Sequence, residues 1–441
     1  MILPESMPAM SVIGNWPESA MGKRRWSRSV AGLLMALWGL AALAAGQDNA
    51  GADLHEPLEI DAEMSWTGLI EQTLVNYPRF LELTARDAEA RALVDRGSKW
   101  FSGQPSVMAR YQTDRVWDDN DLREYELGLE LPLWRLGQRD AARSLGAAAG
   151  AETGAAALAL RHEVVGLLRM ALWDVERAAN ALILAEDGVV VATELVRVVE
   201  RRYDAGDLPL SDTLLVRSTL LERQAVLIEY EAAHVDAERA YQSLSGLGAR
   251  PADFSESLSE LEDWDPSHPW LMLADAEVDR ARAEMELVDR TARGAPTLTV
   301  GPRRERAPFS NVDADSIGIT FAMPFGGQAH RTVQLSAAGR KAAQAEAERA
   351  QLLRQLDLDL HEAHHSMVVI DASLELARER YDLATTSLQM SERAFEQGEI
   401  TLFELLRWEE SARITQREAE SLEIERQRAI AQINQAVGEW P

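Results

Sequence analysis

An unbroken heptad pattern of small and aliphatic residues most constrains the fold of this chain. Apolar residues recur at alternating steps of four and three from Val164 to Val199. These positions are Val164, Leu168, Ala171, Val175, Ala178, Leu182, Ala185, Val189, Ala192, Val196 and Val199. Such spacing is the seam of a coiled coil, so the pattern predicts a helix longer than those of ordinary globular domains.

The same seam returns 192 residues further along the chain. Its positions are Leu356, Leu360, Ala363, Met367, Ile370, Leu374, Ala377, Tyr381, Ala384, Leu388 and the one polar member, Ser391. Gly206 and Gly398 are separated by the same 192 residues, as are Gly246 and Gly438. The chain is therefore predicted to contain two copies of one unit of roughly 190 residues.

Each copy is expected to contain one short helix and two long ones. The short helices are predicted at 66–94, with Pro78 as a kink or start, and at 270–293. The segments 138–203 and 329–395 lack proline and predict the first long helices, each about 100 Å at 1.5 Å per residue. Each breaks at its glycine, Gly206 or Gly398, and a second helix returns. Asp212 is the expected cap of the first returning helix.

Two alternating runs before each long helix predict β-hairpins. The runs are 107–114 and 125–133 in the first copy, joined by a polar turn at 117–121, and 297–301 and 317–325 in the second. We expect 303–314 to be a polar loop. Each hairpin has one apolar and one polar face, and strands of about ten residues cross a bilayer when tilted. Arg110, Glu126 and Glu130 are the expected water-facing residues.

The first 45 residues have the layout of a secretory signal peptide. Basic residues 23–28 precede a sixteen-residue apolar run, and Ala42-Leu43-Ala44 is a small-x-small cleavage signal. Met1 and Met21 both remain as possible starts, and a membrane anchor remains the alternative for the apolar run. The predicted domains are a signal peptide at 1–45, a first repeat at 46–247, a linker at 248–268 and a second repeat at 269–441.

Composition excludes several classes of function. The formal charge is −27, and removing residues 1–45, which carry four basic and two acidic residues, changes it to −29. This balance argues against binding of nucleic acid or anionic lipid. The chain has no cysteine, which excludes disulfides, thiolate metal sites and a cysteine nucleophile.

Four amphipathic strands are too few to close a barrel, since about eight is the smallest number that leaves room for interior side chains. Open sheet edges are not tolerated in lipid, so strands must be pooled between copies of the chain. Three copies would supply twelve. The predicted fold is mainly α with a transmembrane β-barrel portion, closed by trimerisation. A soluble sheet packed on helices is the alternative.

The order of helix, hairpin, long helix, glycine break and helix, written twice, resembles the TolC family of outer-membrane efflux ducts. The matching residues are Arg202-Tyr203-Asp204-Ala205-Gly206 with Leu214, Arg393 to Gly398 with Glu404-Leu405-Leu406, and Asn76-Tyr77-Pro78. The runs 131–139 and 323–326 look most like the branch that serves heavy-metal pumps of the resistance–nodulation–division type.

The resemblance implies a passive homotrimeric exit duct in the outer membrane of a Gram-negative cell, with its helices in the periplasm. A periplasmic adaptor would couple it to an inner-membrane pump that exports metal cations or small molecules. Arg202, Gly206, Arg393 and Gly398 would form the adaptor-docking helix tips, and Glu404 a periplasmic gate. Arg407 departs from the acidic residue expected there, and Glu404 as a solvated first-turn acid is the equal alternative.

Three other functions are compatible with parts of the sequence. A secreted coiled-coil scaffold and a duct for type I protein secretion are the alternatives to efflux. The run His361-Glu362-Ala363-His364-His365 matches the H-E-x-x-H pattern of zinc peptidases. Because Ala363 belongs to the helix seam and no third ligand motif follows, we expect no enzyme, no cofactor and no bound metal.

Overall fold

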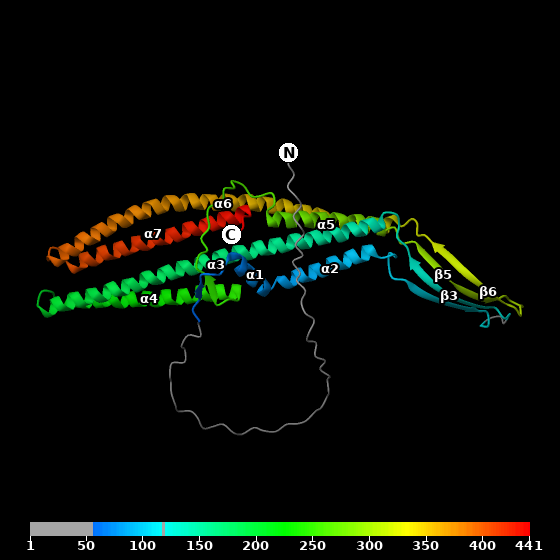
Figure 1. Ribbon diagram of the computed structural model, residues 1–441, viewed down its shortest axis with the longest axis horizontal. Coiled ribbons are helices and arrows are strands. Elements are labelled where there is room, and N and C mark those ends of the chain that lie inside the picture. The colour runs from blue at the N-terminus through cyan, green and yellow to red at the C-terminus, as the bar shows by residue number, and fades with distance from the viewer. Residues whose placement is uncertain (1–55, 117–119) are drawn as a thin grey trace, which may run out of the picture. The chain divides into compact units, whose positions relative to one another are not determined.

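The computed structural model describes residues 56–116 and 120–441. The predicted signal peptide and most of the predicted turn at 117–121 lie outside this part of the chain. Within it, the order of helix, two strands, long helix and returning helix occurs twice. Figure 1 shows this arrangement, with the four strands of the hairpins beyond the ends of the helices.

The predicted long helices are confirmed. Helix α3 spans Gln138–Asp204 and α6 spans Gln328–Glu396, with 67 and 69 residues. The returning helices are α4, Leu210–Ser245, and α7, Leu402–Val437. Every position of the two predicted seams is buried or half-buried, including Ser391. The seams therefore pack against neighbouring helices within the chain, as their spacing predicts.

The predicted helix at 66–94 is two helices, α1 (Trp66–Asn76) and α2 (Phe80–Ser98). Tyr77 adopts an extended conformation at the end of α1, since the ring of Pro78 disfavours a helical residue before it. Helix α5 spans Pro269–Thr291. The expectation that Asp212 caps α4 is wrong, because the N-cap is Pro209 and Asp212 lies inside the first turn.

The hairpins form one antiparallel sheet in the order β2–β3–β5–β6. Strand β2 spans Ser106–Thr113, β3 Arg123–Pro132, β5 Thr297–Arg306 and β6 Asp313–Ala322. The predicted loop at 303–314 is wrong, because both strands continue into it. Cross-strand ion pairs explain this extension: Arg304 Nε lies 2.6 Å from Asp315 Oδ1, and Arg306 Nε lies 2.7 Å from Asp313 Oδ1.

A row of three glycines crosses the middle of this sheet. Gly318 pairs with Gly301, and Gly128 lies one strand further along, opposite Met108. A Cβ on Gly301 would lie 1.8 Å from the carbonyl oxygen of Leu127, so no other residue fits without moving β3. The close approach of the two backbones explains why the strand carries a glycine here.

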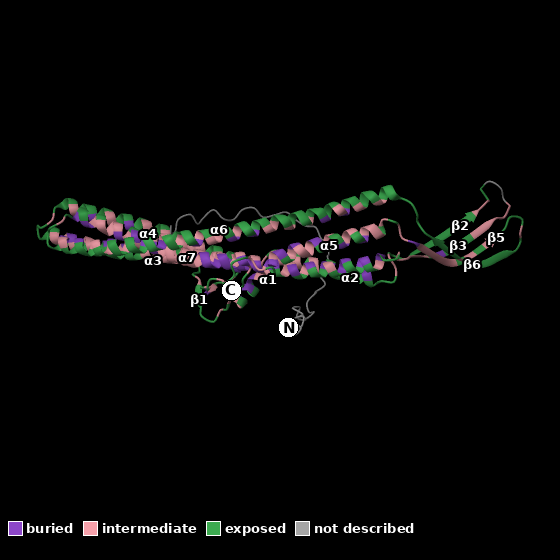
Figure 2. Cartoon of the chain, turned by 90° about the horizontal axis from the view of Figure 1, so that it is seen from above, coloured by how far each residue is buried: buried purple, intermediate pink, exposed green. Residues whose placement is uncertain are grey.

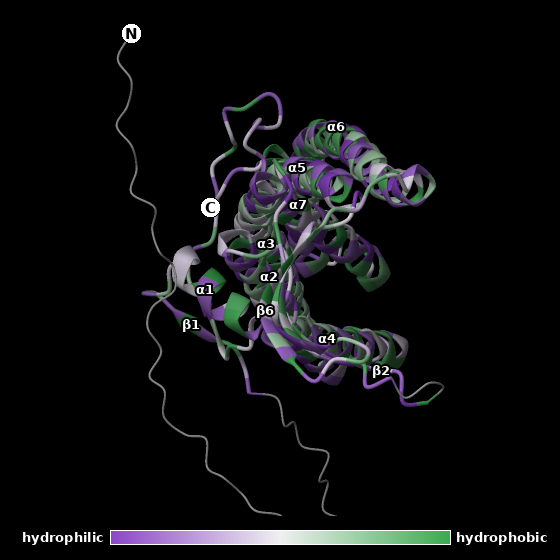
Figure 3. Ribbon diagram, turned by 90° about the vertical axis from the view of Figure 1, so that its right-hand side faces the viewer, coloured by the Kyte–Doolittle hydropathy of each residue, from purple (hydrophilic) through white to green (hydrophobic). Residues whose placement is uncertain are grey.

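Helix α3 is the centre of the helical packing. It contacts α2, α4, α5 and α7, while α6 packs on α5 and α7. Figure 2 shows buried residues concentrated along these helix contacts, and Figure 3 shows that no described helix is hydrophobic throughout. Among residues 56–116 and 120–441, no helix combines the length and apolar character needed to cross a membrane.

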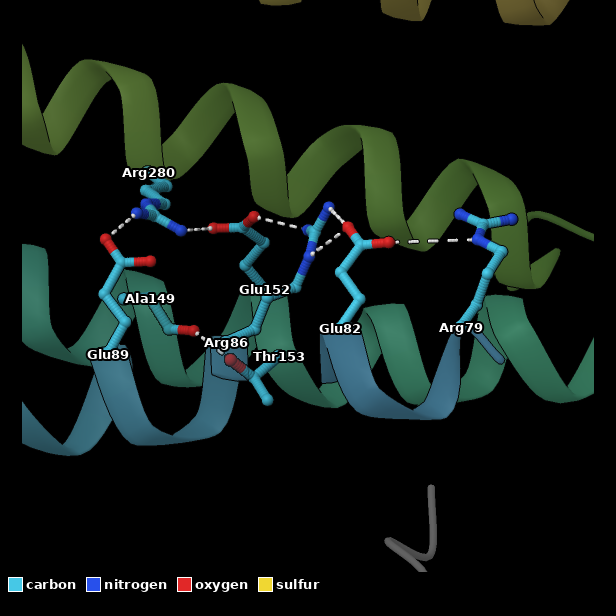
Figure 4. A network of polar contacts seen from close by, with 8 residues as sticks. All are labelled: Arg79, Glu82, Arg86, Glu89, Ala149, Glu152, Thr153 and Arg280. Carbon is cyan, nitrogen blue, oxygen red and sulfur yellow. Dashed lines mark hydrogen bonds and ion pairs between the residues drawn. The ribbon is translucent and has the colours of Figure 1, made fainter. Parts of the chain in front are cut away.

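A buried carboxylate ties three helices together (Figure 4). Glu152 of α3 lies 2.9 Å from Arg86 of α2 and 2.7 Å from Arg280 of α5. Its side chain is 7% exposed, and each arginine also pairs with a second glutamate, Glu82 or Glu89. Because the buried charge is neutralised from both sides, the network fixes the spacing of α2, α3 and α5.

A second buried hub holds the segment after α4 and the C-terminal end of α7 onto α3. Short parallel strands β1 (Glu59–Asp61) and β4 (Ala249–Pro251), which the sequence did not predict, pair here. Arg169 is 1% exposed and donates hydrogen bonds to Glu256, to Gln435 and to the carbonyl of Glu439. These contacts join four parts of the chain that lie far apart in the sequence.

Candidate functional site

The two glycine breaks have the same geometry. Gly206 and Gly398 both adopt positive φ, 83° and 76°. In the first turn the amide of Gly206 donates to Tyr203 and that of Asp207 to Arg202; in the second, Gly398 donates to Phe395 and Glu399 to Ala394. Each pair of bonds is a Schellman motif, in which a left-handed residue ends the helix and satisfies its last carbonyls. The 192-residue repeat therefore extends to the hydrogen bonds of the turns.

The two turns are joined to each other. Arg202 Nη1 donates to the carbonyl oxygen of Phe395 at 3.1 Å, and its guanidinium lies over the Phe395 ring, 4.9 Å from the centroid. Around this contact lies a buried apolar cluster of Val199, Val216, Phe395, Leu402 and Leu405. Arg202, Gly206 and Gly398 are thus brought to one end of the helices. Arg393 lies one turn before Gly398, with its side chain exposed.

Glu404 lies in the first turn of α7 and is held by a capping box. Its backbone N–H lies 3.3 Å from Thr401 Oγ1, and its carboxylate accepts from the backbone N–H and hydroxyl of Thr401 at 2.9 and 3.0 Å. The hydrogen bond from the Thr401 backbone is the main cause that lowers the pKa of Glu404. Arg407, one turn later, lies over the Trp408 ring. Thr401 and Glu404 thus form a capping box at the start of α7.

Sequence reasoning missed a cluster of charges a few turns from the Gly206 and Gly398 turns. Arg223 of α4, 8% exposed, bonds to Glu410 of α7, which also accepts from Arg413. Burial opposes ionisation of Glu410, but hydrogen bonds from the two arginines outweigh it and lower its pKa. Both arginines lie close to Gly188 of α3, whose lack of a side chain leaves room for them.

Away from the ion pairs of Arg304 and Arg306, the charged and apolar residues of the sheet occupy opposite faces. Arg110, Glu126 and Arg303 lie opposite one another in adjacent strands, and Glu130 faces Ser106, in the alternation that places them on one face. The other face is apolar and exposed, with Val107, Leu127, Leu129, Ile317, Ile319 and Phe321 between 45% and 78% exposed. Arg110, Glu126 and Glu130 are therefore brought to the polar face, as the alternation predicts.

The histidines of the H-E-x-x-H run lie on α6. The rings of His361 and His365 are parallel, with centroids 6.4 Å apart, and both side chains are exposed. Glu362 instead lines a groove of about 620 Å³ between α3, α6 and α7. In the described residues, no group of three or more His, Asp and Glu is arranged to hold a metal ion.

Comparison with known proteins identifies the family of the first repeat. Residues 69–247 match the model of the family described as "Outer membrane efflux protein". Residues 69–247 belong to the outer membrane efflux protein family. The family recognised from the helix turns is thereby confirmed. No curated protein sequence matches the chain.

Solved structures of outer-membrane channels share the fold of this chain. VceC of Vibrio cholerae is 18% identical, with a TM-score of 0.67 over 85% of this chain and 96% of VceC. CmeC of Campylobacter jejuni is 12% identical, with a TM-score of 0.66 over 84% of this chain and 85% of CmeC. CusC is 17% identical, with a TM-score of 0.65 over 85% of this chain and 92% of CusC. The match spans both copies of the repeat, so the mainly helical architecture predicted from the seams is that of known channels.

Proposed function

We propose that three copies of this chain assemble into an exit duct of the outer membrane, with their sheets joined in one barrel and their helices in a cylinder that continues into the periplasm. The observation that carries the proposal is the sheet, whose apolar face is exposed and covered by no helix among the described residues (Figures 1 and 2). An exposed apolar surface of this extent requires a lipid or protein neighbour.

The rows of this face match the layers of a bilayer. Rows through Leu127, Leu129 and Leu131 are apolar across the sheet, and the next row holds Tyr111 and Tyr125, whose ring centroids lie 4.9 Å apart. The ion pair of Arg304 with Asp315 continues the tyrosine row into β5 and β6, and the pair of Arg306 with Asp313 lies one row further on this face. An apolar band that ends in a row of aromatic and charged residues is expected where strands leave the hydrocarbon for water.

The sheet also has two unpaired edges, β2 and β6. Backbone groups at these edges have no water to bond to inside a bilayer, so an edge of one copy must pair with an edge of another. Three copies supply twelve strands, an even number within the range of outer-membrane barrels. The face with Arg110, Glu126 and Glu130 then lines the water-filled interior.

The helices carry matching unpaired seams. On α4, Leu214, Leu221 and Ile228 recur every seven residues and are 58–67% exposed. On α6, Val369, Leu376, Leu383 and Met390 recur every seven residues and are 50–65% exposed. Within the chain α4 packs on α3, and α6 packs on α7 and α5. The second seams of α4 and α6 are therefore available to pack against a neighbouring copy.

The resemblance to TolC-type ducts and the N-terminal pattern supply the remaining roles of this proposal. Residues 1–45 direct export, and the repeats at 46–247 and 269–441, joined by the linker 248–268, each supply one hairpin and two long helices. The turns with Arg202, Gly206, Arg393 and Gly398 dock a periplasmic adaptor, which couples the duct to an inner-membrane pump of the resistance–nodulation–division type. Glu404 narrows the periplasmic mouth. The cargo is a metal cation or another small molecule.

Fractionation and conductance together test this function. The mature protein should require detergent for extraction from the outer membrane and should form ion-conducting pores in planar bilayers. A mature protein that appears in the detergent-free periplasmic extract and forms no pores would favour the coiled-coil scaffold. Loss of export after deletion of the gene, with recovery by the intact chain, would connect the pore to efflux.

A further inference from the structure

His361 and His365 form a geometric pair on the surface of α6. The two residues are one helical turn apart, which brings their side chains onto one face. Their rings are parallel within 5°, with centroids 6.4 Å apart, and both side chains are exposed. Two imidazoles at this spacing can offer one nitrogen each to a single ion.

The pair lies on the face of α6 turned away from its packing partner. Leu360 is buried, and Ala363 packs against the cluster that α6 forms with α7. His361 and His365 lie on the opposite side of the helix from these seam positions, since successive residues turn by about 100°. Glu362 lines the groove between α3, α6 and α7 and does not share the face of the pair.

The other described histidines do not offer such a site. His162 and His268 are 0% exposed, and His234 Nε2 lies 3.4 Å from Glu238. His330 is exposed near the start of α6, 31 residues before His361. His364 is half-buried and lies on another side of α6 from the pair.

We propose that His361 and His365 chelate one divalent transition-metal ion, with Cu²⁺ bound most tightly. Imidazole nitrogen suits Cu²⁺, Ni²⁺ and Zn²⁺, and Cu²⁺ leads that series for a given set of ligands. Because no third His, Asp or Glu of the described residues joins the site, water completes the coordination. Both ligands come from one helix, and His365 lies one turn before Val369, where the seam that the proposed duct assigns to a neighbouring copy begins.

The test is a Cu²⁺ titration of the detergent-purified full-length chain without a histidine tag, read by calorimetry and by electron paramagnetic resonance. We expect one tightly bound Cu²⁺ ion per chain and a paramagnetic resonance spectrum typical of two nitrogen ligands. Replacing either member, His361→Ala or His365→Ala, should weaken binding about 100-fold, because chelation by two linked groups gives a gain of that order. Lower pH should also weaken binding, since protons compete for the imidazoles.

His364→Ala and His330→Ala are matched controls, because each removes one imidazole from the same helix and leaves the pair intact. Both should retain wild-type affinity. Equal affinity in the wild type and the His361→Ala variant would overturn the proposal, as would equal losses in the paired and control variants. Circular dichroism of each variant confirms that α6 remains folded, so a loss of binding is not a loss of structure.

Discussion

Arg202 and Phe395 join the two helix turns of the chain through both backbone and ring. The guanidinium donates to the Phe395 carbonyl at 3.1 Å and lies 4.9 Å from the ring centroid. The same carbonyl also accepts the amide of Gly398. The two helical hairpins are thereby fastened at the end where the proposed duct would open.

Loss of the contact between Arg202 and Phe395 should let the two helix turns move apart. We expect Arg202→Ala to raise the ion conductance of the protein in planar bilayers, because a hydrogen bond to a charged group and a cation–π contact are both lost. Arg201→Ala is the matched control, since that side chain is 67% exposed and lies 3.8 Å from Glu194. Equal conductance in the two variants would show that the contact does not restrain the mouth.

Substitution of the turn glycines should destabilise the fold. Gly206→Ala forces a Cβ into a left-handed conformation, which costs about 1 kcal/mol. Gly150 of α3 is the control, because it is exposed in a helix interior with no atom within 4 Å of an added Cβ. Gly150→Ala should stabilise by up to about 1 kcal/mol. Thermal unfolding should therefore shift in opposite directions in the two variants.

Outside the sheet, substitution of Arg169 should lower the free energy of unfolding more than substitution at any other ion pair. Its side chain is 0% exposed and lies 2.6 Å from Glu256, itself 8% exposed. Arg169→Met leaves a buried carboxylate unpaired and should cost about 3–5 kcal/mol in the free energy of unfolding. The surface pair of Arg177 and Asp174 supplies the comparison, where Arg177→Met should cost about 0–1 kcal/mol. Addition of Glu256→Gln to Arg169→Met should recover part of the loss.

Stability should fall in acid because of a buried histidine. Burial, with the charges of His268 and Arg169, lowers the pKa of His162 from 6.5 to about 3. Between these values the unfolded chain binds more protons than the folded one, so stability is full above pH 6.5 and declines as pH falls toward 3. His162→Phe should reduce the difference between denaturation midpoints at pH 7.5 and pH 4. His330→Gln, at an exposed site, should leave that difference unchanged.

The elements that could be predicted are those whose signal is periodic and local. The seam from Val164 to Val199 and the breaks at Gly206 and Gly398 depend on neighbours a few residues away, so sequence alone located them. The extension of β5 and β6 was missed because Arg304 and Asp315 look like loop residues until their strands pair. The hydrogen bond between Arg169 and Glu256 joins residues 87 positions apart, and no sequence pattern predicts it.

In the proposed duct, neighbouring copies pack through the second seams of α4 and α6. The chain has no cysteine, so Leu221→Cys together with Leu383→Cys introduces one unique pair. After oxidation in intact cells, a non-reducing gel of the membrane fraction should show a covalent three-chain species that a thiol reductant returns to monomer. A single-chain band, with both cysteines open to alkylation, would contradict the assembly on which the proposed duct depends.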